Sequence, residues 1–142
     1  GGRLKDAAIL DLFAGTGALG LEALSRGAAF VDFVENGPEA LHALKANRAK
    51  LRATRDSRLF KKEVFTFLDG VEGQVYDLAL ADPPYTSSGA NRLVERWHRK
   101  PFSTILSVEH SRDVILPGKG TRRVYEDSAV TTYRTSQKLE ES

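Results

Sequence analysis

A short glycine-rich stretch near the start of the chain could hold a small ligand. Residues 11–20 read DLFAGTGALG, and the three glycines match the G-x-G-x-x-G pattern of nucleotide-binding turns. Gly15 and Gly17 lack a Cβ atom, so the backbone can pass close beneath a ligand. Asp11 stands at the end of the strand predicted before them, where a carboxylate would repel a pyrophosphate and attract an amino group or a sulfonium. The stretch therefore favours S-adenosylmethionine over a nicotinamide dinucleotide; the alternative is a tight strand-to-helix turn without a ligand.

Two more carboxylates stand where predicted strands end. Glu35 follows the second strand, 18 residues after Gly17, where a carboxylate can accept hydrogen bonds from both hydroxyls of a ribose. Glu63 follows the third strand and could accept a hydrogen bond from an adenine amino group, with Val64 against the ring. The alternative for both carboxylates is an ordinary surface charge.

A second motif, Asp82-Pro83-Pro84-Tyr85, follows the most apolar predicted strand. The prolines stiffen the backbone and leave nearby carbonyl groups free to accept hydrogen bonds. A carboxylate and a fixed carbonyl suit an exocyclic amine with two hydrogens, and Tyr85 offers a base a stacking face worth about 1–3 kcal/mol. The amine of cytosine, adenine or guanine is a poor nucleophile because it is conjugated with its ring, and holding both hydrogens would aim its lone pair at a methyl group. The motif therefore predicts N-methylation of a base; the alternative is a proline turn with a buried tyrosine.

These residues need a scaffold that brings the ends of several strands together. Apolar runs predict strands at residues 7–12, 30–35, 58–61, 76–81, 104–108, 122–125 and 129–134, with 76–81 buried on both faces. Helices are predicted at 18–26, from Pro38 onward with Leu41, Leu44 and Leu51 as its buried stripe, at 64–68 and at 91–98. Strands alternating with helices predict a mostly parallel α/β sheet covered on both faces, and the closing pair of strands predicts one antiparallel strand. Ligands bind at the carboxyl ends of the strands in such sheets, which is where both motifs fall.

Composition is typical of one globular domain. The 142 residues are 41% hydrophobic and 28% charged, which excludes a disordered chain. Cysteine is absent, which excludes disulfides and thiolate chemistry, and His42, His98 and His110 show no metal-ligand spacing. No apolar run approaches the roughly 18 residues of a membrane span. We therefore expect no metal, no membrane partner and a cytoplasmic location.

Charge is distributed unevenly along the chain. The formal net charge is +2, but residues 45–62 hold eight basic residues and one acid. Such a segment can attract a polyanion, or it can form a solvated face. The chain opens without a methionine, and we expect an upstream segment in the native protein. We also expect residues 1–142 to form a single domain, monomeric, with a frayed polar tail at 135–142.

The two motifs and Glu35 together resemble class I S-adenosylmethionine-dependent methyltransferases that act on exocyclic amines. More narrowly, residues 10–28, which read LDLFAGTGALGLEALSRGA, are similar to the RsmD family. Its members methylate the amino group (N2) of one guanine in bacterial small-subunit (16S) ribosomal RNA. The segment VEH at 108–110 is also similar, as are Tyr125 and Asp127, so the resemblance covers about residues 7–134.

The resemblance implies a Rossmann-like sandwich with a seven-stranded sheet, S-adenosyl-L-methionine as cofactor, and ribosomal RNA or the assembling small ribosomal subunit as partner. It places around the cofactor Asp11, Phe13, Ala14, Gly15, Thr16, Gly17, Glu35, Asn36, Glu63 and Val64. It makes Asp82, Pro83, Pro84 and Tyr85 the catalytic loop that holds the flipped guanine. The sequence departs from the family at Glu63, where aspartate is usual, and at Glu126, where glycine is favoured. The family also has an upstream segment that carries RNA contacts, and we expect this chain to begin after it.

Three other functions remain open. A DNA adenine or cytosine methyltransferase shares the Asp-Pro-Pro-Tyr motif, although 142 residues leave no room for a target-recognition domain. A nicotinamide-dependent oxidoreductase domain shares the glycine pattern, but Asp11 and the absence of a substrate domain argue against it. A non-catalytic RNA-binding module would share the fold, but intact Asp82 and Tyr85 argue against that.

Overall fold

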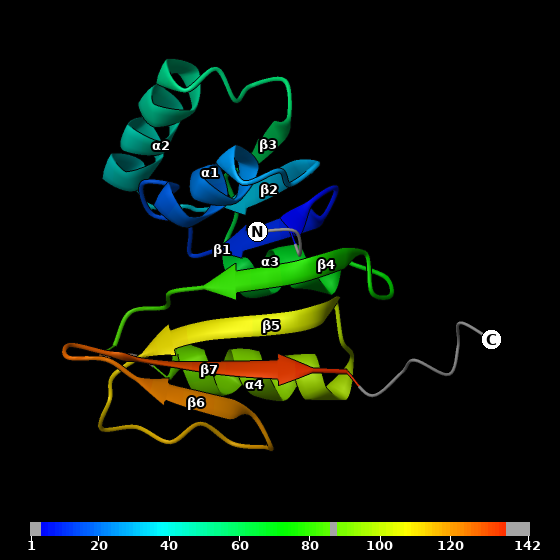
Figure 1. Ribbon diagram of the computed structural model, residues 1–142, viewed down its shortest axis with the longest axis vertical. Helices are drawn as coiled ribbons and strands as arrows, with labels where there is room; N and C mark the ends of the chain where they lie inside the picture. Colours follow the sequence, from blue (N-terminus) through cyan, green and yellow to red (C-terminus); the bar gives the residue numbers. More distant parts are fainter. Residues whose placement is uncertain (1–3, 86–87, 136–142) are drawn as a thin grey trace.

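The computed structural model describes residues 4–85 and 88–135, and it places helices on both faces of one twisted sheet (Figure 1). The seven strands in these residues are β1 (Ala8–Leu12), β2 (Phe30–Val34), β3 (Ser57–Phe60), β4 (Tyr76–Ala81), β5 (Ser103–His110), β6 (Thr121–Val124) and β7 (Ala129–Arg134). Their order in the sheet is β3-β2-β1-β4-β5-β7-β6. Strands β1 to β5 run parallel, and β7 is antiparallel to both of its neighbours. The predicted Rossmann-like, mostly parallel α/β sheet with one antiparallel strand near the C-terminus is confirmed.

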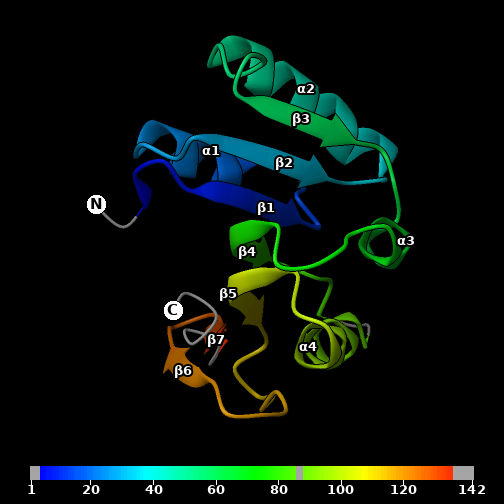
Figure 2. The same ribbon diagram turned by 90° about the vertical axis from the view of Figure 1, so that its right-hand side faces the viewer.

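The helices divide between the two faces of the sheet (Figure 2). They are α1 (Ala18–Ser25), α2 (Pro38–Lys50), α3 (Val64–Asp69) and α4 (Gly89–Arg99). Helices α1 and α2 pack over β1 and β2 on one face, in a core that includes Ile9, Phe33 and Leu44. Helices α3 and α4 cover the other face, in a larger core that includes Leu68 and Trp97.

Strand β1 shows how the sequence directs side chains to these two cores. Successive side chains of a strand point to opposite faces. Leu10 and Leu12 therefore enter the core under α3 and α4. Ile9 enters the core under α1, and Asp11 points to the same face as Ile9. A carboxylate thus lies on an otherwise apolar face, at the end where the strand meets the glycine loop.

One predicted core residue is wrong. Leu51, assigned to the buried stripe of the second helix, is 61% exposed, whereas Leu41 and Leu44 are buried as predicted. Helix α2 ends at Lys50, and the next turn reverses at Arg52, whose φ angle is 55°. The reversal takes Leu51 off the helical stripe and buries Ala53 in the core instead.

Strand β4 is less covered than its apolar sequence predicts. Leu78 and Leu80 are only half-buried, although Ala79 and Ala81 are fully inside. In Figure 1 none of the described helices lies in front of β4 and β5, so this face of the sheet is open. The prediction of burial on both faces is therefore wrong for part of β4.

The helices and the C-terminal end of the described chain bear on two further predictions, the absence of a membrane span and a frayed tail. None of the helices in the described part of the chain is long and apolar enough to cross a membrane. The amide of Thr135 donates to the carbonyl of Thr104 at 3.0 Å, so the chain follows β5 to this point. The rest of the predicted frayed tail, 136–142, lies outside the described residues.

Candidate active site

The glycine loop between β1 and α1 has an unusual backbone. Phe13, Gly15 and Gly17 have φ angles of 55, 59 and 84°, all in the left-handed region. Glycine adopts this region freely, whereas another residue there costs of order 1–3 kcal/mol. A Cβ atom built on Gly15 would meet no other atom within 4 Å. The crest of the loop is therefore open, and it presents bare backbone to whatever lies above it.

Glu35 ties this loop to the end of β2. One carboxylate oxygen accepts a hydrogen bond from the Gly15 amide at 2.7 Å, and the other accepts one from the Gly37 amide at 2.9 Å. A carboxylate oxygen can accept more than one hydrogen bond, so this half-buried side chain keeps acceptor capacity for a ligand. The neighbouring Asn36 is exposed, as is Thr16 on the loop itself. Glu35 therefore shapes the loop before any ligand binds.

Asp11 lies beneath the loop. The residue is 2% exposed, and its Oδ2 accepts a hydrogen bond from the Gly20 amide, in the first turn of α1, at 3.0 Å. Burial raises the pKa of Asp11 to about 7, the Gly20 hydrogen bond opposes this, and the charges of Asp82 and Glu35 add to it. Three of the predicted site carboxylates are thus close enough to affect one another. The side chain of Asp11 has almost no contact with solvent, so a direct contact with a ligand above the loop is not available to it in this conformation.

Glu63 caps the N-terminus of α3. Its carboxylate accepts hydrogen bonds from the Phe65 and Thr66 amides, both at 2.9 Å. These bonds, first the one from Phe65, hold the pKa of Glu63 below its usual value. Val64 packs into the core and is 4% exposed. The structure therefore gives Glu63 a capping role, and the adenine contacts assigned to Glu63 and Val64 stay predictions.

The loop at 82–85 leaves the sheet beside the glycine loop. The last residues of β1 and β4 pair with each other, so both loops start from adjacent positions at one edge. Loss of solvent around its carboxyl group raises the pKa of Asp82, and the charge of Glu109 raises it further. The ring of Tyr85 is 49% exposed, as stacking of a base requires. The glycine loop and the loop at 82–85, which are far apart in the sequence, therefore lie next to each other at this edge of the sheet.

Sequence reasoning did not include Glu109 among the site residues. It stands near the end of β5, and the preceding residue, Val108, pairs with Ala81 of β4. The Tyr85 hydroxyl donates to the Glu109 carboxylate over a long distance of 3.5 Å. The signal was present, because Glu109 is a carboxylate near the carboxyl end of a predicted strand, the rule that found Glu35 and Glu63.

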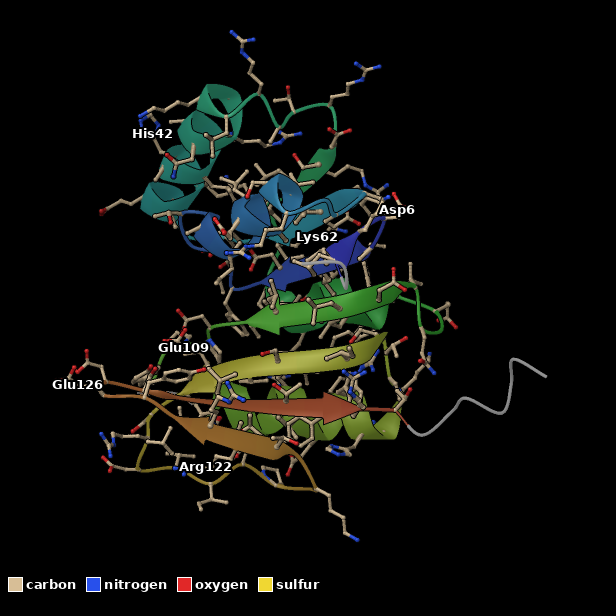
Figure 3. All side chains as sticks on the ribbon, viewed as in Figure 1. Asp6, His42, Lys62, Glu109, Arg122 and Glu126 are labelled. Atoms are coloured by element: carbon tan, nitrogen blue, oxygen red, sulfur yellow. The ribbon has the colours of Figure 1, made fainter. Side chains whose placement is uncertain are left out.

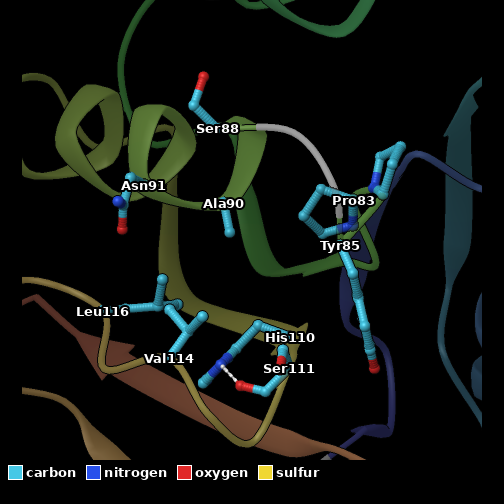
Figure 4. Close-up of a pocket in the computed structure, with 10 residues that line it drawn as sticks. Pro83, Tyr85, Ser88, Ala90, Asn91, His110, Ser111, Val114 and Leu116 are labelled. Carbon is cyan, nitrogen blue, oxygen red and sulfur yellow. Dashed lines mark hydrogen bonds between the residues drawn. The ribbon is translucent and has the colours of Figure 1, made fainter.

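A hollow lies beside the proline loop (Figure 4). Its lining includes both prolines, the start of α4 at Ala90 and Asn91, and Val114 and Leu116 from the connection after β5. The figure shows the Tyr85 side chain pointing away from Asn91 and Leu116. Tyr85 and His110 also line the hollow, so it lies next to the residue whose hydroxyl contacts Glu109.

His110 has a structural role at the base of this hollow. It is 3% exposed; one ring nitrogen lies 2.7 Å from the Thr131 hydroxyl and the other 2.9 Å from the Ser111 carbonyl. The Thr131 contact joins β5 to β7, and the Ser111 contact is local. In the part of the chain that the structure describes, no group of three or more histidine, aspartate or glutamate side chains could hold a metal ion.

The basic segment at 45–62 is partly structural. The Arg58 guanidinium forms a two-bond ion pair with Asp32, 2.8 Å for each bond, and Asp32 also accepts from the Tyr76 hydroxyl at 2.6 Å. Arg48 bonds the Ser57 hydroxyl and carbonyl. The other cations of the segment are exposed: Lys45, Lys50, Arg52, Arg55, Lys61 and Lys62. Lys61 and Lys62 lie between the end of β3 and Glu63, so part of this charge is next to a predicted site residue.

Comparison with known proteins places this chain in a family. The sequence profile described as Conserved hypothetical protein 95 matches residues 1–128. The chain belongs to this family. A relative in Buchnera aphidicola named "Ribosomal RNA small subunit methyltransferase D" is 28% identical over 123 residues, which cover 83% of this chain and 64% of that protein. The Escherichia coli K12 protein of the same name is 40% identical over 82 residues, covering 58% of this chain and 40% of that protein.

The fold is shared with a solved structure. A conserved hypothetical protein from Streptococcus pyogenes superposes with a TM-score of 0.83 at 28% identity, covering 93% of this chain and 88% of that one. The chain thus spans less than two thirds of the length of the two named relatives and most of the length of this one. The resemblance to RsmD-type proteins expected from the sequence is confirmed.

Proposed function

We propose that the chain is a methyltransferase domain that uses S-adenosyl-L-methionine to methylate the N2 amine of a guanine in 16S ribosomal RNA. The observation that carries the proposal is the meeting of two loops at paired strand ends. An open glycine loop, held by Glu35 and Asp11, stands beside the loop at 82–85, which carries an exposed ring and a carboxylate. The names of the relatives support ribosomal RNA of the small subunit as the substrate.

The cofactor fits the residues present around the glycine loop. Glu35 would bind the ribose with its remaining acceptor capacity, and Gly15 leaves room for the ligand to lie on the backbone. The other residues assigned to the cofactor are Asp11, Phe13, Ala14, Thr16, Gly17, Asn36, Glu63 and Val64; of these, Asp11, Gly17 and Val64 are buried and would act through the loop and the core beneath the cofactor. When bound, the cofactor supplies an electrophilic methyl group on a sulfonium.

The loop at 82–85 would prepare the amine. Asp82 accepts one of its hydrogens, and a carbonyl of the proline turn accepts the other, which directs the nitrogen lone pair. The amine loses one proton when its new N–C bond forms, and the raised pKa of Asp82 suits it to accept that proton. Tyr85 stacks on the base, which partly offsets the few kcal/mol needed to take a base out of its stack.

Two measurements test the function. Calorimetry on this chain should show binding of S-adenosylmethionine or S-adenosylhomocysteine and none of NAD; NAD binding without S-adenosylmethionine binding would refute the proposal. Mass analysis of nucleosides after incubation with 16S RNA or small subunits should then show N2-methylguanosine. Methylated adenosine or cytidine, or methylation of duplex DNA alone, would assign the domain to the other amino-methyltransferases. Cofactor binding with no methyl transfer to any substrate would favour the non-catalytic module.

A further inference from the structure

We propose that Glu109 determines the base specificity of this site by accepting a hydrogen bond from the N1–H group of the target guanine. The proposal rests on the proposed function, because it takes the loop at 82–85 as the place where an exocyclic amine is methylated. It adds a residue that reads which base carries that amine.

The position of Glu109 follows from the sheet register. Ala81 of β4 and Val108 of β5 are partners, so Asp82, the first residue after β4, lies beside Glu109, which is still within β5. Val108 and His110 are buried, and strand alternation sends Glu109 to the opposite, open face. Figure 3 shows Glu109 at that edge of the sheet, between the ends of β4 and β5.

The surroundings of Glu109 are rich in acceptors. The Tyr85 hydroxyl is its one hydrogen-bond donor within the described residues, at 3.5 Å. Loss of solvent raises the pKa values of Asp82 and Tyr85, and the charge of Glu109 raises both further. On the other side of β5 its partner in β7 is the apolar Val130. Among the described residues no lysine or arginine forms an ion pair with Glu109 or Asp82. Two neighbouring carboxylates thus face the base site without a cation between them.

Such a pair of acceptors fits guanine and opposes the other two amino bases. Guanine presents the N1–H donor next to its N2 amine, so one carboxylate can hold the amine and the other can hold N1–H. Adenine and cytosine carry a ring nitrogen with a lone pair, an acceptor, next to their amines. Glu109 would meet that lone pair with a negative oxygen, leaving both groups unsatisfied. Sites built to hydrogen-bond a group reject an analogue that lacks it by large factors, up to about 10⁴–10⁵.

The experiment compares guanosine with 2-aminopurine riboside at the target position of the same RNA. 2-Aminopurine keeps the 2-amine but has an acceptor at N1. Under single-turnover conditions the wild-type domain should methylate the guanosine RNA at least about 100-fold faster. In Glu109→Gln, whose amide can donate to an N1 acceptor, the rate on guanosine should fall and the preference for guanosine should shrink by at least about tenfold.

The matched control is Glu126→Gln, an exposed carboxylate on the β6–β7 turn at the same edge. It should keep the wild-type preference, and both variants should bind S-adenosylhomocysteine like the wild type, which shows that they are folded. An unchanged preference in Glu109→Gln would overturn the role of Glu109 and leave the proposed function standing. No N2-methylguanosine from the wild-type domain would overturn both.

Discussion

Replacing Asp11 with asparagine should make the stability of the domain less dependent on pH and should weaken its binding of S-adenosylmethionine. Burial raises the pKa of Asp11 from 3.8 to about 7. Between these two values the folded state holds a proton that the unfolded state has released, so the free energy of unfolding falls as pH rises through the window. Asparagine does not titrate, and its side-chain oxygen can still accept the hydrogen bond from Gly20.

The expected size follows from the width of that window. One pH unit within it corresponds to about 1.4 kcal/mol. Between pH 5 and pH 7 the wild-type protein should therefore lose roughly 2–3 kcal/mol of stability relative to Asp11→Asn. Above pH 7 the difference in stability between the two proteins should level off, since the Asp11 carboxyl group is then ionised in both the folded and the unfolded wild-type protein.

Urea unfolding of both proteins at pH 5, 6, 7 and 8 measures this difference directly. Asp113→Asn, at an exposed aspartate in the connection after β5, is the control and should show no such trend. Calorimetry at pH 8 should show weaker S-adenosylmethionine binding in Asp11→Asn, because the negative charge beneath the loop is gone. A stability difference between the two proteins that does not change with pH, or that shifts in favour of the wild type as the pH rises, would refute the account of Asp11. Unchanged affinity would show that the ligand does not use its charge.

Three further predictions concern the loop at 82–85 and the edge strand β3. Asp82→Ala should reduce single-turnover methylation at least about 100-fold with little change in cofactor affinity, because the carboxylate is assigned to the amine; near wild-type turnover would contradict this. Tyr85→Phe should be milder than Tyr85→Ala in the same assay, because stacking needs the ring and not the hydroxyl, and equal losses would argue against stacking. Arg58→Ala should lower the free energy of unfolding by about 1–3 kcal/mol, because it leaves the fully buried Asp32 without its ion pair. Urea unfolding would measure that loss, Arg58→Lys should recover part of it, and no loss at all would show that the pair is not stabilising.

The strands were predictable because each has a local cause. Apolar runs, the prolines after β4 and the glycines after β1 mark their ends, and all seven predicted strands are present with ends shifted by two residues or fewer. Leu51 was not predictable, because its exposure depends on where the chain reverses at Arg52. The half-buried state of Leu78 and Leu80 depends on which helices reach β4, which no local pattern reports.

The candidate site was predictable as a set of strand ends and less so in its contacts. Asp11, Glu35 and Asp82 were placed at one edge of the sheet from the sequence, and the structure brings them together. The bond from Gly20 to Asp11 and the cap that Glu63 gives α3 are local contacts that a pattern of residue types does not reveal. The residue type of Glu109 and its place near a strand end are visible in the sequence, but its position beside the loop at 82–85 depends on the register between β4 and β5.

The pairing of β1 with β4 also sets when a working site can form during folding. The strand that carries the glycine loop first finds β2 as its neighbour, and its second neighbour arrives only after two helical crossovers and β3 have been added. Pairings between distant parts of a chain form late, because the long intervening segment must first be ordered. During synthesis, the half containing β1, β2 and Glu35 can therefore assemble before the loop at 82–85 exists. A chain arrested before β4 would carry Glu35 and the glycine loop without the loop at 82–85, so the proposed site becomes complete only when the two halves of the sheet have joined.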